Sequence, residues 1–167
     1  MNAQDFLQLL RRLGACSEAV TWAKGKSLGE VWSTCERADW MLWLCGRMVG
    51  TDGWPTRQEV VLAACSCAET VLHHFEKKYP QDDRPRKAIE AARAWTSGNL
   101  DTESLYKARR AAYAAAYAAA DAAAYAAYAA AAYAAAAYAA AARADTLRSL
   151  SKTVRELLTV PSEWVRS

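Results

Sequence analysis

Residues 108–144 read ARRAAYAAAYAAADAAAYAAYAAAAYAAAAYAAAARA, and this stretch decides the fold class that the sequence predicts. It holds 27 alanines among 37 positions, and alanine has the highest helix propensity of all residues. The stretch therefore predicts a long α-helix, and no strand pattern stands out elsewhere in the chain. We expect an all-α protein, a multi-helix bundle with a long alanine- and tyrosine-rich C-terminal helix.

The length of this helix raises a packing problem. Unbroken from residue 102 to about 158, it would be roughly 85 Å long at 1.5 Å per residue. It must therefore project, bend or break, or pack against copies of itself. Asp145, Thr146 and Leu147 could also cap a separate last helix. By composition, 1–100 is a Trp-rich helical region and 101–167 is the Ala/Tyr-rich helix with a C-terminal helix, and we expect both to form one continuous domain.

The tyrosines of the tract form a stripe. At 100° per residue, five of them fall within an arc of about 80°, namely Tyr106, Tyr113, Tyr117, Tyr128 and Tyr138. The stripe predicts either a packing seam, within the fold or between protomers, or a row of stacking platforms for a planar ligand. Tyr113 and Tyr117 are candidate ligand-binding residues in the second case, and a homo-oligomer is expected in the first. A third interpretation is an isolated rod or an ice-binding helix. The ice-binding form is disfavoured because threonine is absent from 108–144.

Capping boxes and chain-breaking residues divide the first 100 residues into several helices. Ser27 with Glu30 and Thr56 with Glu59 have the Ser/Thr-x-x-Glu pattern that begins a helix. Glycines and Pro80 supply stop signals. The expected helices run over about 6–13, 17–24, 28–49 as one helix or two, 57–78, and from Asp82 or Asp83 to Gly98.

Charge and cysteine usage exclude several classes of site. The net charge is +3 without a long run of Lys or Arg, so nucleic acid is an unlikely partner. The five cysteines are irregularly spaced, and we expect them to be reduced and mostly buried. Cys65 and Cys67 lack zinc-ligand spacing, and the adjacent His73 and His74 point about 100° apart on a helix. We therefore expect no metal site and no cofactor.

Motifs for catalysis and for membrane insertion are equally scarce. The chain has no glycine-rich phosphate loop, no serine elbow and no paired carboxylates. We expect no catalytic residues and no enzymatic activity. The N-terminus does not resemble a signal peptide, and no strongly apolar stretch reaches about 18 residues, which predicts a cytoplasmic protein without a membrane association.

One group of candidate binding residues surrounds a tryptophan. Arg37 and Asp39 flank Trp40, and Trp43 follows three positions later. These residues predict either a structural ion pair beside a core tryptophan, or an aromatic pocket for a nucleotide-like ligand. In the second case Trp40, Trp43 or a tyrosine stacks on a base and the arginine holds a phosphate.

A second group lies at the expected start of a helix. Arg84 and Arg86 follow Asp82 and Asp83. The free backbone N–H groups of a helix N-terminus attract anions, and either arginine could clamp a phosphate or a carboxylate there. The alternative is that the aspartates cap the helix and pair with the arginines.

Two stretches resemble a known family. They are ERADWMLWL at 36–44 and HFEKKYPQDDRPRKAIEAARAW at 74–95. The second resembles the immunity protein family of bacterial polymorphic toxin systems and its alanine-rich phage and prophage relatives, and the resemblance covers about 36–120. It implies an all-α protein that neutralises something in a bacterial or phage conflict. It implies no particular target and no catalytic residues.

These observations lead to one main functional hypothesis and one alternative. The main hypothesis is a non-enzymatic inhibitor in the cytoplasm of a bacterial host cell, which sequesters its target. The target is a toxin protein or a nucleotide-derived immune signal, and in the second case the chain is a phage anti-defence sponge. The alternative is a structural protein that assembles through its Ala/Tyr helix.

Overall fold

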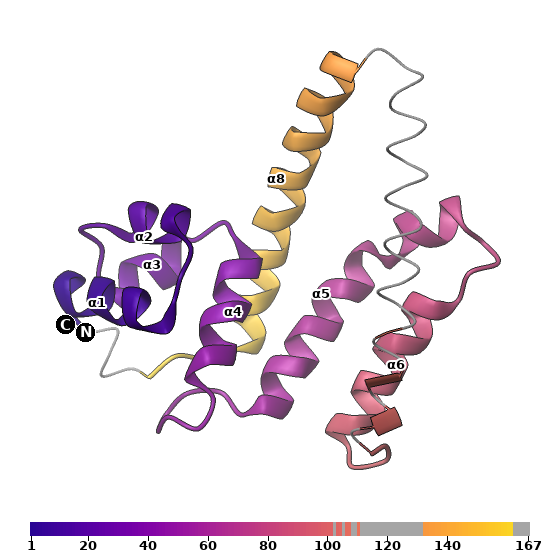
Figure 1. Ribbon diagram of the computed structural model, residues 1–167, viewed down its shortest axis with the longest axis horizontal. Coiled ribbons are helices and arrows are strands. Elements are labelled where there is room, and N and C mark those ends of the chain that lie inside the picture. Colours follow the sequence, from indigo (N-terminus) through magenta and orange to yellow (C-terminus); the bar gives the residue numbers. More distant parts are fainter. Residues whose placement is uncertain (102, 105, 108–109, 111–131, 162–167) are drawn as a thin grey trace. The chain divides into compact units, whose positions relative to one another are not determined.

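The computed structural model describes residues 1–101, 103–104, 106–107, 110 and 132–161, with the side chains of 132–141 left out. Within these ranges the chain forms seven α-helices and no β-strand, which confirms the all-α, multi-helix fold (Figure 1). The helices are α1 (Ala3–Leu13), α2 (Ser17–Ala23), α3 (Leu28–Thr34), α4 (Ala38–Met48), α5 (Arg57–Lys78), α6 (Arg84–Thr96) and α8 (Ala132–Leu157).

Both predicted capping boxes begin a helix. At α3, Glu30 N–H donates to Ser27 Oγ at 3.3 Å, and Ser27 N–H donates to Glu30 Oε2 at 2.7 Å. Thr56 and Glu59 exchange the same pair of bonds ahead of α5. The predicted bounds of α5, 57–78, are confirmed. The start is predictable because a capping box joins residues only three positions apart. The segment 28–49 is two helices, separated at 35–37.

The chain forms two compact units. The N-terminal unit is Met1–Val60 with Leu147–Ser167, and the second unit is Val61–Thr146. The core of the N-terminal unit combines residues from α1 to α4 with Ser151, Val154 and Leu158 from the far end of the chain. The division at residue 100 that the composition suggests stays a prediction about domain organisation.

The end of α8 corrects one sequence-based alternative. The helix continues without a break from Ala132 to Leu157, so no separate last helix begins at Asp145. Thr146 Oγ1 donates to the carbonyl oxygen of Ala142 at 2.8 Å, four residues back, a bond that fits inside a helix. Whether one helix spans 102–158 stays untested, because 111–131 lie outside the described residues.

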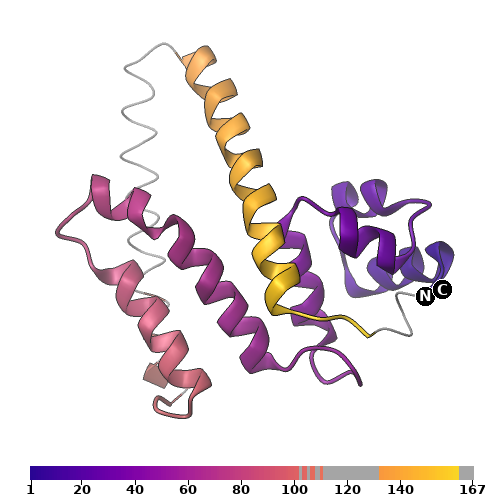
Figure 2. The ribbon, with the colours of Figure 1, turned by 180° about the vertical axis from the view of Figure 1, so that it is seen from behind.

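Within the second unit, α5 and α6 lie side by side (Figure 2). Arg93 Nη2 and Nε each donate to a carboxylate oxygen of Glu69 at 2.7 Å, and Cys65 Sγ donates to the carbonyl oxygen of Ile89 at 3.9 Å. These contacts join the two helices along their length.

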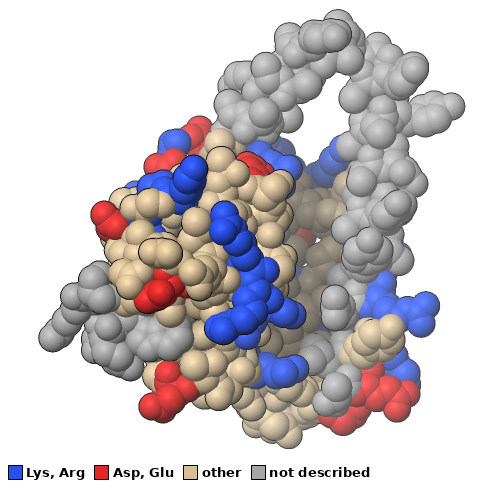
Figure 3. All heavy atoms as spheres, turned by 60° about the vertical axis from the view of Figure 1, so that its left-hand side comes forward, with Lys and Arg blue, Asp and Glu red and all other residues tan. Residues whose placement is uncertain are grey.

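Charged side chains interrupt the surface throughout the view of Figure 3. Several Lys and Arg side chains gather near its centre, and Asp and Glu side chains lie mainly toward its edges. Both signs are thus distributed over this face, as the near-balanced composition predicts. In the part of the chain that the structure describes, no helix is both long and apolar enough to cross a membrane.

Candidate functional site: a tryptophan pocket

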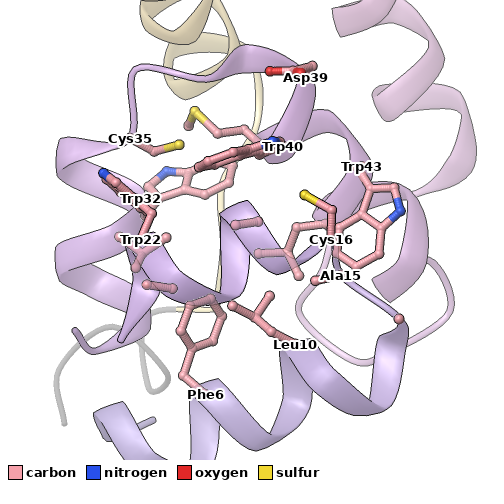
Figure 4. Close-up of a pocket in the computed structure, with 16 residues that line it drawn as sticks. Phe6, Leu10, Ala15, Cys16, Trp22, Trp32, Cys35, Asp39, Trp40 and Trp43 are labelled. Atoms are coloured by element: carbon pink, nitrogen blue, oxygen red, sulfur yellow. The ribbon is translucent and has the colours of Figure 1, made fainter. Parts of the chain in front are cut away.

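A pocket with a volume of about 320 Å³ lies in the N-terminal unit (Figure 4). Helices α1 to α4 and the loop between α1 and α2 form its walls, and most of its lining is apolar. We call it the tryptophan pocket, because four tryptophans converge on it. Its lining residues are Phe6, Leu10, Gly14, Ala15, Cys16, Ala19, Trp22, Ala23, Val31, Trp32, Cys35, Asp39, Trp40, Met41, Trp43 and Leu44.

The tryptophans reach the pocket from three helices. Trp22 lies in α2 and Trp32 in α3, while Trp40 and Trp43 lie three positions apart in α4 and so share a face. The ring centroids of Trp22 and Trp40 are 5.9 Å apart with their planes tilted by 58°, a favourable geometry for two aromatic rings. All four side chains are half-buried. Each indole therefore packs against the core and also presents surface to a ligand.

Two cations contact these indoles from outside the pocket lining. Lys26 Nζ is 4.1 Å from the centroid of the Trp22 ring, and it donates to the carbonyl oxygen of Trp22. Arg37 Cζ is 4.3 Å from the centroid of the Trp40 ring. A cation over an indole face is attracted by the ring quadrupole. These contacts hold Trp22 and Trp40 in place.

Arg37 is committed to two carboxylates. Its Nε and Nη2 donate to Asp39 at 2.9 and 2.7 Å, and its Nη1 donates to Glu18 at 3.2 Å. The hydrogen bonds from Arg37 hold the pKa of Asp39 below its ordinary value. Asp39 lines the pocket and Arg37 does not. The charged group in the described pocket lining is thus the carboxylate of Asp39, which is already paired with Arg37.

Two thiols also line the pocket, and they differ in exposure. Cys16 is exposed, whereas Cys35 is buried and donates to the carbonyl oxygen of Arg37 at 3.6 Å. Burial raises the pKa of the Cys35 thiol. All five cysteines are free and four of them are buried, which confirms the prediction for this residue type.

Arg155 supports the wall of the pocket from the other end of the sequence. Its Nη1 donates to the carbonyl oxygens of Trp32 and Cys35 at 3.3 and 2.8 Å, and it lies 3.8 Å from Met41 Sδ. Its Nη2 donates to the hydroxyl of the fully buried Ser151 at 3.2 Å. Trp32, Cys35 and Met41 all line the pocket. The far end of α8 therefore fixes three of its lining residues.

The sequence-based candidates around Trp40 come together here. Asp39, Trp40 and Trp43 line the pocket, and Arg37 lies against Trp40. Sequence reasoning missed Trp22, Trp32, Cys16 and Arg155, because no spacing connects α2, α3 and α8 to this site. The high tryptophan count was a signal of an aromatic cluster, but it did not say which indoles would meet.

Arg84 and Arg86 belong to the second unit and do not line the pocket. Arg84 donates to both carboxylate oxygens of Asp82, at 2.8 and 2.7 Å, and Arg86 Nε donates to Glu76 at 2.7 Å. Arg84 thus pairs with an aspartate, as the structural alternative predicts. Arg86 pairs with Glu76 instead, and the side chain of Asp83 does not cap α6.

The tyrosine candidates Tyr113 and Tyr117 lie outside the described residues, and Tyr106 of the same stripe is exposed. The tyrosine row as a ligand platform and the homo-oligomer therefore stay predictions. Across the described ranges, no cluster of three or more His, Cys, Asp or Glu side chains could hold a metal ion.

A family model described as "Imm-5 like putative immunity protein" matches residues 55–147, more than half of the chain. The chain belongs to this family. Membership confirms the resemblance seen in the sequence, and it indicates a binding or inhibitory role in biological conflict, with a toxin as the general class of partner. The family is generally non-enzymatic. No curated protein and no solved structure matches the chain.

The family match and the tryptophan pocket occupy different parts of the chain. The match includes α5, α6 and α8 as far as Leu147, which corresponds closely to the second unit. The pocket is lined by residues between Phe6 and Leu44, all before the match begins. The pocket therefore lies outside the residues that the family model matches.

Proposed function

We propose that this chain is an immunity protein that neutralises a toxin protein by binding and sequestering it, without transforming it. The observation that carries the proposal is the tryptophan pocket, where four half-buried indoles surround an open cavity in a member of an immunity protein family. Tryptophan is enriched among the residues that dominate binding energy at protein interfaces. Partly exposed indoles around a cavity are therefore suited to anchor a partner.

The chemistry of the pocket supports binding without turnover. A cysteine nucleophile needs a neighbouring base or a lowered pKa to react rapidly. Burial raises the pKa of Cys35, and no histidine is present among the described residues that line the pocket. Asp39 is held by Arg37. The groups present are thus placed to contact a partner.

A nucleotide-derived immune signal is a second candidate target. The stack of Arg37 on Trp40 favours it, because a base could pack on an indole while the guanidinium binds a phosphate. Against it, Arg37 already binds Asp39 and Glu18, and phosphate recognition needs cations with free donors. The protein target is therefore preferred.

Co-expression with a toxin whose gene adjoins the gene for this chain tests the proposal. We expect wild-type chain to restore growth and to bind the purified toxin in isothermal titration calorimetry, with the toxin recovered chemically unaltered. Trp43→Ala should weaken binding at least tenfold, because removal of an interface tryptophan commonly costs more than about 1.4 kcal/mol. Leu42→Ala, a neighbouring half-buried residue outside the pocket lining, serves as the matched control.

Two results would contradict the proposal. If the purified chain does not bind the toxin and cells die despite its expression, sequestration is wrong. If the toxin is recovered with a covalent change after incubation with the chain, the non-enzymatic mechanism is wrong.

Assembly through the Ala/Tyr helix stays the alternative function. Light scattering of the full chain and of a 108–144 deletion separates the two. An oligomer that becomes a folded monomer after the deletion would favour assembly. A monomeric full chain would exclude it.

A further inference from the structure

We infer that the tryptophan pocket receives one uncharged aromatic side chain of the bound protein, an inference that rests on the proposed function. The pocket has the size, the charge and the ring geometry for this occupant. A phosphorylated nucleotide also has an aromatic ring, but it is larger and carries a negative charge.

The volume suits a single ring system. A closed apolar cavity of about 150 Å³ is enough to bind benzene in a protein interior. Ligand pockets for whole drug-sized molecules span about 300–1,000 Å³. At about 320 Å³ the tryptophan pocket is at the lower limit of that range, so it has room for one phenyl, phenol or indole group with part of its backbone.

The charge of the wall disfavours an anion. Asp39 contributes a carboxylate to the lining, and the hydrogen bonds from Arg37 keep that carboxylate ionised by lowering its pKa. The two cations near the indoles, Lys26 and Arg37, do not belong to the described lining. A phosphate in the pocket would meet a like charge and would lose its hydration without gaining a free cationic donor. An uncharged group avoids this penalty.

The arrangement of the indoles favours an aromatic occupant over an aliphatic one. Trp22 and Trp40 are tilted by 58° to one another, so their surfaces converge at an angle (Figure 4). A third ring inserted beside them contacts one indole face to face with an offset and another edge to face, which are the preferred geometries of aromatic pairs. Trp32 and Trp43 supply further indole surface on the same pocket.

Cys16 provides a built-in reporter for occupancy. Its exposed thiol lines the pocket together with Trp43 (Figure 4), whereas the other four thiols are buried. A ring bound in the pocket should shield this sulfur from alkylation. The rate at which iodoacetamide modifies Cys16, followed by mass spectrometry, therefore measures occupancy on the full wild-type chain.

The test titrates the full chain with N-acetyl-L-tryptophanamide, an uncharged mimic of the proposed side chain, and in parallel with AMP. We expect the amide to slow Cys16 alkylation saturably, with a Kd on the order of 1 mM because the rest of the partner is missing. It should also shift indole N–H signals in NMR spectra. AMP should do neither. Saturable binding of AMP at lower concentration, or no effect of the amide, would overturn the inference.

Two variants locate the binding. Ala19→Phe places a ring inside the pocket and should abolish the effect of the amide, whereas Thr21→Phe, on the exposed side of the same helix, should leave it unchanged. Trp43→Leu removes an indole from the wall and should weaken amide binding several-fold, which keeps the test decisive if Ala19→Phe does not fold. Unchanged amide binding in a folded Ala19→Phe chain would contradict the assignment to this pocket.

The amide titration needs no toxin, so its failure is distinguishable from failure of the proposed function. If the toxin binds wild type and Ala19→Phe equally well, sequestration stands and the aromatic anchor is wrong. If the amide binds and the toxin does not, the pocket chemistry stands and the proposed function is wrong.

Discussion

At the scale of single residues, the five cysteines differ in burial: one is exposed and four are buried. Burial raises the pKa of Cys45 to about 12 and raises the pKa of Cys35, Cys65 and Cys67 as well. Cys16 is exposed at the end of the loop that follows α1. Since the thiolate is the reactive form, four of the thiols are protected both by burial and by protonation.

Iodoacetamide at pH 8 should therefore modify Cys16 first and the other thiols at least tenfold more slowly. Tandem mass spectrometry of tryptic peptides during a short reaction measures the five rates, and fragmentation separates Cys65 from Cys67, which share one peptide. In urea the same reagent should modify all five cysteines at similar rates, which provides the control. Comparable alkylation rates in the native chain would mean that the other four thiols are not buried.

Asp39 carries a second prediction at this scale. Its folded-state pKa is lowered, chiefly by hydrogen bonds from Arg37, so the pair contributes stability above the pKa of the unfolded chain and loses it as pH falls through the lowered folded-state value. Because the carboxylate is half exposed, the contribution should be about 0.2–1 kcal/mol. Asp39→Asn should lower the free energy of unfolding by this amount at pH 7.

Urea unfolding of both proteins at several pH values measures the effect. The difference between wild type and Asp39→Asn should shrink as the pH falls below about 4. Asp52→Asn, at an exposed position between α4 and α5, should change stability by less than about 0.5 kcal/mol at pH 7. A difference between wild type and Asp39→Asn that grows toward low pH would contradict the assignment.

At the scale of the elements, Arg155 of α8 supplies hydrogen-bond donors to the C-terminal end of α3. The last carbonyls of a helix have no partner within the helix. Arg155 donates to two such oxygens, those of Trp32 and Cys35, and its positive charge interacts favourably with the negative end of the α3 dipole. One side chain thus joins α3 to a helix more than 100 residues later in the sequence.

Arg155→Met should lower the free energy of unfolding by about 1.5–3 kcal/mol, the usual contribution of hydrogen bonds that involve a charged group. Methionine preserves much of the apolar stem, so the loss reports the donors. Lys152→Met, an exposed change on the same helix, should have little effect. Equal stability losses in the two variants would show that the bonds to α3 do not contribute.

At the scale of the whole molecule, the N-terminal unit is completed by residues from the end of the chain. Val154 is fully buried and Leu158 is 2% exposed, within a unit whose other buried hydrophobic residues precede residue 61. Leu157, next to it in sequence, is 50% exposed. The two leucines therefore form a matched pair in which burial alone differs.

Leu158→Ala should destabilise the protein by about 2–5 kcal/mol, because it removes a buried side chain and leaves a cavity. Leu157→Ala should cost less than about 1 kcal/mol, as expected for a surface change. Urea unfolding monitored by tryptophan fluorescence measures both. If the two losses are equal, the end of the chain does not belong to the core of the N-terminal unit.

The sequence by itself determined the helical class and the places where helices begin and end. Alanine propensity, the capping boxes at Ser27 and Thr56 and the stop at Pro80 all act within a few residues, so they can be interpreted without a tertiary structure. Asp39, Trp40 and Trp43 were found together for the same reason, since they lie within two turns of one helix.

Only the tertiary structure decided which indoles share a pocket and which arginines are paired. Trp22 and Trp32 reach the site from other helices, and Arg155 reaches its wall from the end of the chain. These contacts depend on how the helices pack. Packing brings side chains together according to their shape and burial, whatever their separation in the sequence. Local patterns do not contain that information, so the sequence alone could not show that Arg84 pairs with Asp82 or that α8 continues through Asp145 without a break.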